Sequence, residues 1–256
     1  MTDPRPAPAD RNRWTLSPTH VDLRRPVLPA RPVWLPGLPQ ALTLDLSRTA
    51  LVVVDVQNDF GAPDGWLASI GVDVSPVAGL VARLAPAIDG MRTAGVPVVW
   101  VNWGNRPDRA NIPPGVRHVY DPDGASTGIG DVLPNGSRVL EAGSWSVAPL
   151  DGLVPRPEDV TVAKYRMSGF PDTPLDSILR NLRVDTLLLA GVNTDQCVVA
   201  TLVDAANLGY DVVLLEDLCA TTSPAYCTDA TLYNVRQCFG FTATARDLLT
   251  ALAAAG

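Results

Sequence analysis

Three residues of different chemistry each follow an apolar segment of this chain. Asp55 and Lys164 each come directly after such a segment, and Cys197 follows the apolar residues 187–190 after a short polar turn. A carboxylate can accept a proton, an ammonium group is a compact cation, and a thiol is a nucleophile when it is deprotonated. Brought together, the three can carry acyl transfer through sulfur.

The cysteine lies where a strand is expected to turn into a helix. Residues 187–190 predict a buried strand, and Asn193-Thr194-Asp195 offers side chains that can cap a helix over residues 197–209. A second strand is predicted at residues 212–215, which completes a parallel βαβ unit. At the start of a helix, the dipole favours a thiolate and backbone N–H groups can hold an oxyanion. The alternative is that Cys197 is a buried small apolar residue.

Lys164 is the only lysine among 20 basic residues. A general preference for arginine explains the shortage of lysines, but it does not explain why one lysine is kept at this place. Lysine carries a compact charge whose pKa shifts readily on burial, which the planar guanidinium of arginine does not match. This contrast makes Lys164 a candidate functional residue.

Alternating strands and helices predict a three-layer α/β/α sandwich with a mainly parallel sheet. The carboxyl ends of parallel strands lie at one edge of a sheet, so we expect Asp55, Lys164 and Cys197 to converge there. The predicted strands are residues 50–54, 96–102, 159–163, 187–190, 212–215 and 239–242, and the predicted helices are 73–94, 173–182, 197–209, 228–237 and 245–255.

Two segments stand apart from this alternation. Residues 1–42 are dense in proline and predict an extended arm, with the compact domain at residues 43–256. Trp14 and Trp34 make the arm too apolar for a purely solvated tail, so an arm packed across a subunit boundary competes with a disordered one. Residues 103–158 lack predicted regular elements, which indicates a segment that covers a site or contacts a partner.

The composition excludes several classes of function. The net charge of -7 argues against binding to nucleic acid or to an anionic membrane, and no apolar run is long enough to span a bilayer. The N-terminus has no signal-peptide core, so a cytoplasmic location is the default expectation. Cys219, Cys227 and Cys238 form no disulfide or zinc pattern and are interpreted as packing residues, and two histidines supply no paired metal motif.

The segments VVVDVQNDF, VAKYRMSGF and AGVNTDQCV, in this order and spacing, resemble the isochorismatase-like cysteine hydrolases over roughly residues 45–250. The resemblance implies an Asp-Lys-Cys triad made of Asp55, Lys164 and Cys197, and a cis peptide at Val192–Asn193 that shapes an oxyanion hole at Asn193 and Cys197. It implies no cofactor and a homo-oligomer, commonly a dimer or tetramer. Where the metal-binding branch carries an aspartate-histidine cluster, this chain reads WVNWGNRPDR, so no metal is expected.

Within that superfamily, SGFPDTPLDSILRNL, GVNTDQC and TLYNVRQCFGF resemble enzymes that act on ureido compounds. Biuret hydrolases are the most similar branch, and ureidoacrylate amidohydrolases are the neighbouring one. The resemblance implies cleavage of a terminal carbamoyl C–N bond, with biuret giving allophanate and ammonia, and with triuret close behind. Ureidoacrylate and N-carbamoyl amino acids are the alternatives, and they need a carboxylate partner such as Arg166, Arg106 or Arg109.

Further candidates for substrate contact are Gln237, Phe60, Asn102, Trp103 and Arg166. Each has a plainer interpretation, since Gln237 can be a polar residue near a helix end and Phe60 can fill the core. Two other classes of function stay open. The first is a catalytically silent α/β binding protein in which the triad is a structural charge network. The second is a thiol redox protein, against which the lack of a C-x-x-C pair argues.

Overall fold

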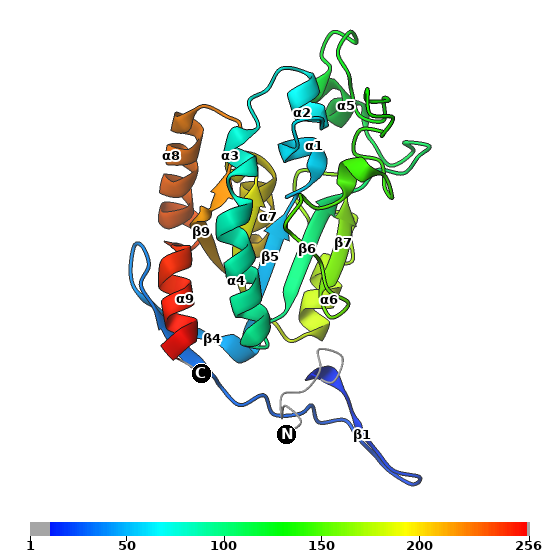
Figure 1. Cartoon of the computed structure of the whole chain (residues 1–256). Coiled ribbons are helices and arrows are strands. Elements are labelled where there is room, and N and C mark those ends of the chain that lie inside the picture. The colour runs from blue at the N-terminus through cyan, green and yellow to red at the C-terminus, as the bar shows by residue number, and fades with distance from the viewer. Residues whose placement is uncertain (1–10, 255–256) are drawn as a thin grey trace.

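A sheet of six parallel strands runs through the computed structural model, which describes residues 11–254. The strand order is β10-β9-β8-β5-β6-β7 (Figure 1). The predicted, mainly parallel sheet is therefore confirmed. Its strands are β5 (Thr49–Val54), β6 (Val98–Trp103), β7 (Val160–Lys164), β8 (Thr186–Val192), β9 (Asp211–Ala220) and β10 (Phe241–Ala243).

The two central strands explain why the sheet is buried on both faces. β5 reads TALVVV and all six of its residues are buried, and β8 reads TLLLAGV with only Thr186 partly accessible. Such continuous apolar runs are typical of parallel strands covered by helices on both sides. From β5 the chain order proceeds outward to β6 and β7, and from β8 it proceeds the other way to β9 and β10. A crevice is expected beyond the carboxyl ends of β5 and β8, where the order reverses.

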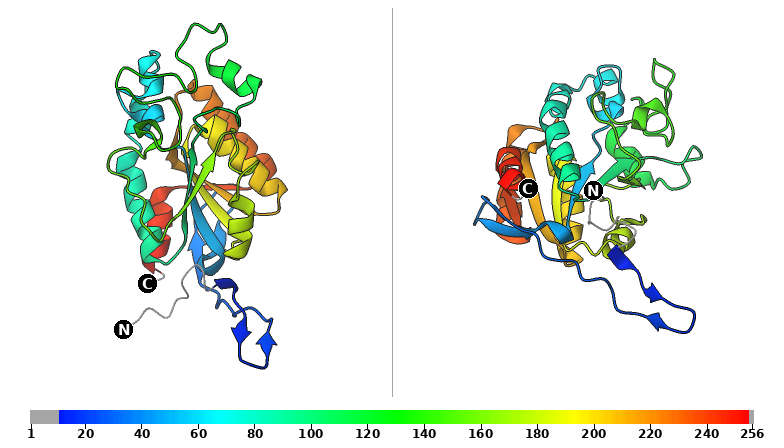
Figure 2. Two further views of the ribbon diagram at one scale, coloured as in Figure 1. Left: turned by 90° about the vertical axis from the view of Figure 1, so that its right-hand side faces the viewer. Right: turned by 60° about the horizontal axis from the view of Figure 1, so that its bottom comes forward.

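Helices cover both faces of the sheet and make the outer layers (Figure 2). On one face lie α4 (Val81–Thr93) and α9 (Ala245–Ala254), and on the other lie α6 (Leu175–Asn181), α7 (Val199–Asn207) and α8 (Ala225–Asn234). The predicted three-layer sandwich is confirmed. Within residues 11–254, no helix is long and apolar enough to cross a membrane.

Two predicted segments differ in detail from the structure. The single helix expected over residues 73–94 is divided near Gly79 into α3 (Ser75–Ala78) and α4. The expectation that residues 103–158 lack regular elements is wrong, because Pro114 starts a helix there, as proline can at a first helical position. Residues 103–158 contain α5 (Pro114–Tyr120) and η3 (Trp145–Val147), and the short helices α1 (Asn58–Gly61) and α2 (Trp66–Ser69) follow β5.

The proline-rich arm contains two antiparallel pairs of strands. β1 (Thr15–Leu16) pairs with β2 (Val21–Asp22) in a hairpin that projects from the body (Figures 1 and 2). β3 (Pro32–Leu35) pairs with β4 (Leu42–Asp45), which leads through η2 (Leu46–Arg48) into β5. Val33 and Leu35 of β3 are buried in the core, whereas Trp14 and Trp34 are 50% and 64% exposed in the single chain. The division of the chain at residue 43 stays a prediction.

Candidate active site

Asp55 and Lys164 meet at the carboxyl edge of the sheet. Lys164 is the last residue of β7 and Asp55 follows β5, and the Nζ of Lys164 lies 2.6 Å from the Oδ2 of Asp55. The other carboxylate oxygen accepts the Trp103 backbone N–H at 2.8 Å, and the ammonium group donates to the Arg166 carbonyl at 3.0 Å. The ring of Trp103 lies 4.2 Å from Nζ, which adds a cation–π contact. The pair is thus held in place from several sides.

Cys197 completes the group from the other side of the crevice. It lies in the π-helical turn η4 (Thr194–Val198) between β8 and α7, and only 4% of its surface is exposed. Asp55 and Lys164 both act on the pKa of its thiol, so the three groups are close neighbours. The structure therefore brings the three predicted residues together. The expected cis peptide at Val192–Asn193 is also present.

Close packing of β5 against β8 sets the spacing of the two sides. Gly191 adopts φ +123°, and a Cβ on it would lie 2.1 Å from the Val54 carbonyl oxygen, so no other residue fits there. Directly after Val54, Asp55 itself adopts φ +51°. Such a left-handed conformation is uncommon for a residue with a side chain, and it turns the chain sharply at the end of the strand.

The polar residues after β8 do not cap the helix as predicted. Asn193 precedes η4 but makes no side-chain capping bond. Its Oδ1 accepts the Thr222 N–H at 3.4 Å, while the Thr221 hydroxyl donates to Asp195 at 2.5 Å. Gln196 adds a hydrogen bond to Ser223 at 3.3 Å. The loop after β9 therefore fastens the turn that carries Cys197, a role that the sequence analysis did not assign to these polar residues.

Two backbone N–H groups of the same turn are bonded within it. The Asn193 carbonyl accepts the N–H of Gln196 at 3.1 Å and that of Val198 at 3.2 Å, on either side of the Cys197 N–H. The assignment of the oxyanion hole to Asn193 and Cys197 stays a prediction.

Burial is the largest single influence on the pKa of each of the three groups. Burial raises the pKa of Asp55 despite the opposing effect of Lys164. Burial lowers the pKa of Lys164, but the neighbouring Asp55 carboxylate and Cys197 sulfur outweigh it, so the pKa is raised. For Cys197, burial outweighs the effect of Lys164 and raises the thiol pKa to about 12. The expected resting thiolate is therefore corrected to a neutral thiol, because the desolvation cost of a buried anion exceeds what one ammonium group returns.

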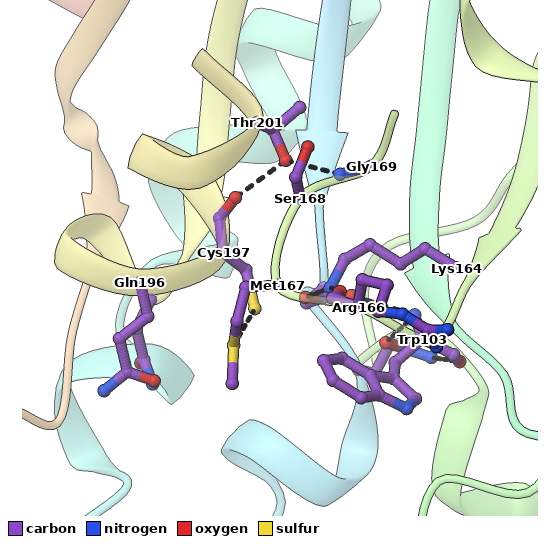
Figure 3. Close-up of polar contacts among 12 residues, drawn as sticks. Trp103, Lys164, Arg166, Met167, Ser168, Gly169, Gln196, Cys197 and Thr201 are labelled. Carbon is purple, nitrogen blue, oxygen red and sulfur yellow. Dashed lines mark hydrogen bonds and ion pairs between the residues drawn. The ribbon is translucent and has the colours of Figure 1, made fainter. Parts of the chain in front are cut away.

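The loop between β7 and α6 is tied to the cysteine turn. The Thr201 hydroxyl donates to the Cys197 carbonyl at 2.7 Å and accepts the Gly169 N–H at 2.9 Å (Figure 3). Met167 of the same loop places its Sδ 3.8 Å from the thiol sulfur. These contacts fix the position of the thiol relative to the segment that follows Lys164.

Trp103 contacts two residues of the triad, the pocket role of Phe60 stays a prediction, and Asn102 does not face the triad. Trp103 contacts Asp55 and Lys164 as described, and Phe60 lies buried in α1, one short turn after Asp55. Asn102 is adjacent to Trp103 in β6, so its side chain points to the opposite face of the sheet. The predicted pocket contact of Asn102 is therefore corrected.

Arg166 lies near the triad but its guanidinium group is already engaged. Its Nη1 donates to the carbonyls of Asn111 at 2.8 Å and Tyr165 at 3.0 Å, and its Nη2 lies 3.2 Å from the Asp172 carboxylate. The side chain keeps 29% of its surface exposed. A substrate carboxylate would have to compete with these partners.

Gln237 lies at the outer edge of the sheet, beside β10 and α7. It belongs to η5 (Val235–Phe239), after α8 has run back from the carboxyl edge, and neighbouring Gly240 packs against Val212 at the start of β9. Gln237 is exposed in a shallow hollow lined by Pro39, Asp229, Leu232, Tyr233 and Arg236. The structure does not bring it to the triad of its own chain, because the helix before it carries the chain away from the site.

The residues after Asp55 have a structural role that the sequence analysis missed. The Nε2 of Gln57 donates to the carbonyls of Trp103 and Val147, both at 2.8 Å, and Asn58 donates to the Trp145 carbonyl at 2.9 Å. The buried Asp59 carboxylate accepts the Leu140 N–H at 2.8 Å. Together they fasten residues 140–147 over the carboxyl edge of the sheet. A run of amide and acid side chains directly after a buried strand was the signal for it.

Among residues 11–254, no group of three or more histidine, cysteine, aspartate or glutamate side chains is arranged to hold a metal ion. Absence of a metal at the site stays a prediction, because it rests on the sequence resemblance.

Comparisons with known proteins agree with this geometry. The isochorismatase domain model matches residues 49–247. The chain is 37% identical to a ureidoacrylate amidohydrolase (RutB) of Methylobacterium radiotolerans over 210 residues, covering 82% of this chain and 81% of that protein. It is 36% identical to a protein of the same name from Agrobacterium fabrum, covering 83% of this chain and 93% of the other.

Solved structures show the same architecture. A cysteine hydrolase from Pseudomonas syringae pv. phaseolicola superimposes with a TM-score of 0.71 at 27% identity, covering 83% of this chain and 96% of the other. An N-carbamoylsarcosine amidase from Thermoplasma acidophilum superimposes with a TM-score of 0.59, also at 27% identity, covering 77% and 96%.

Proposed function

The chain belongs to the isochorismatase family, and on that premise we propose that it is a cysteine amidohydrolase that cleaves the terminal carbamoyl C–N bond of a small ureido compound. One observation carries the proposal. Asp55, Lys164 and Cys197 converge at the carboxyl edge of the sheet, with a 2.6 Å ion pair beside the thiol. A proton acceptor, a fixed cation and a nucleophile are the groups that acyl transfer through sulfur requires.

The protonation of the site suits a concerted first step. Cys197 starts as a neutral thiol, and Asp55 takes its proton as the sulfur attacks the carbamoyl carbon. A raised pKa makes Asp55 a stronger base for this transfer. Backbone N–H groups near Asn193 and Cys197 stabilise the oxyanion, and each such donor contributes about 3 kcal/mol in the transition state.

The second half of the reaction reuses the same carboxyl group. Protonated Asp55 gives its proton to the leaving nitrogen, which breaks the C–N bond, releases ammonia and leaves a thiocarbamate on Cys197. A water molecule then gives a proton to Asp55 and attacks the thiocarbamate carbon. The thiol is released with its proton restored, and the product carries the new carboxyl group.

As the leading substrate class we propose N-carbamoyl acids such as ureidoacrylate. The names of the two relatives at 36–37% identity support this choice, and so does the N-carbamoyl substrate named for the Thermoplasma acidophilum structure. The carboxylate of such a substrate needs a cation. Arg166 is the candidate, and it would have to exchange its Asp172 partner for the substrate.

Biuret is the second candidate, with triuret beside it. Engagement of Arg166 by two carbonyls and a carboxylate favours a neutral substrate, because such a substrate needs no free guanidinium group. Cleavage of one terminal C–N bond of biuret by the steps above gives allophanate and ammonia.

Ammonia release from a panel of compounds at equal concentration tests the proposed reaction and the order of the two substrate classes. The panel contains ureidoacrylate, an N-carbamoyl amino acid, biuret, triuret and nicotinamide, and the Cys197→Ala variant is the blank. We expect ammonia from ureido compounds, with ureidoacrylate fastest, and none from nicotinamide. If none of the ureido compounds is cleaved, the proposed reaction is wrong.

An Arg166→Gln variant separates the two substrate classes. If Arg166 binds a carboxylate, the variant loses kcat/KM for ureidoacrylate by roughly tenfold or more while that for biuret changes little. A biuret rate that exceeds the ureidoacrylate rate in the unmodified enzyme would reverse the order of the two candidates.

A further inference from the structure

The hairpin formed by β1 and β2 stands away from the body of the chain. Thr15 pairs with Asp22 and Leu16 pairs with Val21, and the Ser17 N–H donates to the His20 carbonyl at 2.9 Å to close the turn. Figures 1 and 2 show the hairpin extending beyond the end of the sheet opposite the triad, without packing on its own domain.

The chain segments on both sides of this hairpin arm, residues 13–25, are hydrogen-bonded to the body. Before it, the buried Arg11 donates to the Ser47 carbonyl at 3.0 Å. After it, Arg183 donates to the Pro26 carbonyl at 2.5 Å, and Arg31 donates to the Ala94 carbonyl at 2.7 Å. An arm fixed at both ends presents its tip in a defined direction, which distinguishes it from a loose terminal tail.

The hairpin arm exposes apolar side chains that its own chain does not cover. The exposed fractions are 50% for Trp14, 71% for Leu16, 46% for Val21 and 59% for Leu23. A two-stranded hairpin is at best marginally stable alone in water, and both of its edges carry unpaired backbone groups. Clustered apolar surface on such an element is typical of an interaction site.

Charge is divided unequally between the arm and the rest of the chain. The hairpin arm, residues 13–25, contains three arginines and one aspartate, whereas residues 26–256 contain 15 basic and 24 acidic residues. The hairpin arm thus carries a net charge of about +2 and residues 26–256 carry about -9 at neutral pH. A basic, apolar hairpin therefore fits the acidic body of a second copy of the same chain.

We propose that the hairpin arm packs against a second copy of this chain and holds a homo-oligomer together. The arm supplies apolar side chains for the centre of the contact, and its arginines face acidic groups of the partner. This assembly role is separate from the proposed reaction, because the hairpin arm does not contact Asp55, Lys164 or Cys197.

The native mass of the purified full chain tests the proposal. Light scattering after size separation should give a multiple of 27.1 kDa for the unmodified protein. The double variant Leu16→Asp and Val21→Asp should shift the dissociation midpoint at least tenfold to higher concentration. Both side chains are exposed in the single chain, so thermal unfolding of the monomer should be unaffected. Val154→Asp is the matched control, since Val154 is 72% exposed outside the arm, and its mass should match the unmodified protein.

Either of two results overturns the proposal. A purified protein that is monomeric at micromolar concentration would show that the arm does not bind a second copy, even if it captures another protein. An unchanged oligomer in the double variant would show that the arm does not hold the assembly together. The Cys197→Ala variant should assemble like the unmodified protein, so a failure here is distinct from a failure of the proposed reaction.

Discussion

The Nζ of Lys164 lies 2.6 Å from the Oδ2 of Asp55, and these side chains are 0% and 1% exposed. Taking two charges out of water costs several kcal/mol for each ion before their attraction is counted. A buried ion pair is therefore weak support for stability by itself. Its position beside a buried thiol indicates that the fold keeps it for chemistry.

Removal of either reacting group should stop turnover. We expect Cys197→Ala to abolish ammonia release, because the nucleophile is lost. The protein should keep its fold, because the change removes only one small buried group. Asp55→Asn should lower kcat by at least about 10²-fold, since an amide cannot accept the thiol proton. Steady-state ammonia release and thermal unfolding of both variants measure this. A Cys197→Ala protein with residual turnover would contradict the nucleophile assignment.

Replacement of Lys164 by arginine should fail although the charge is kept. Lys164 is fully buried between Asp55 and the Trp103 ring, and the planar guanidinium group is larger than the space that an ammonium group occupies. We expect a loss of activity of more than about 10²-fold. Arg48→Lys is the control, because Arg48 forms an exposed pair with Asp185 and its change should be silent. Near-normal activity of Lys164→Arg would remove this residue from the mechanism.

The resting thiol of Cys197 should react slowly with iodoacetamide. Its pKa is raised to about 12 and its surface is 4% exposed, so little thiolate is available at pH 7. The exposed Cys238 should be alkylated first, and the rate at Cys197 should rise roughly tenfold for each pH unit up to about pH 12 while the fold persists. Peptide mass spectrometry over time measures each site. Faster labelling of Cys197 than of Cys238 at pH 7 would mean that the resting enzyme holds a thiolate.

Gly191→Ala should destabilise the protein strongly. The new Cβ would lie 2.1 Å from the Val54 carbonyl oxygen at φ +123°, so both strain and overpacking oppose it. We expect a loss of more than about 3 kcal/mol in the free energy of unfolding. Gly209→Ala is the matched control, because Gly209 has φ +93° and nothing within 4 Å of an added Cβ. Its loss should be about 1 kcal/mol in urea unfolding. Equal losses at the two sites would refute the close approach of β5 and β8.

The strands and the three residues that follow them could be predicted from the amino-acid sequence alone. Apolar runs such as those before Asp55 and Lys164 are local features, and a parallel sheet places the carboxyl ends of its strands at one edge whatever the loops do. For the same reason, convergence of Cys197 with the other two was predictable from the order of strands and helices. Only the direct contacts among the three required coordinates.

The tertiary structure decided what depends on direction and burial. Asn102 and Trp103 are adjacent in sequence, but only the packing of α6 and α7 on one face of the sheet determines that Trp103 faces the triad. Gln237 lies in a segment that resembles a pocket segment, yet α8 leads it to an exposed hollow at the outer edge of the sheet. The pKa of the Cys197 thiol is raised although the helix N-terminus and Lys164 both favour a thiolate. The desolvation cost depends on all the atoms packed around the thiol, and the sequence alone does not show which atoms these are.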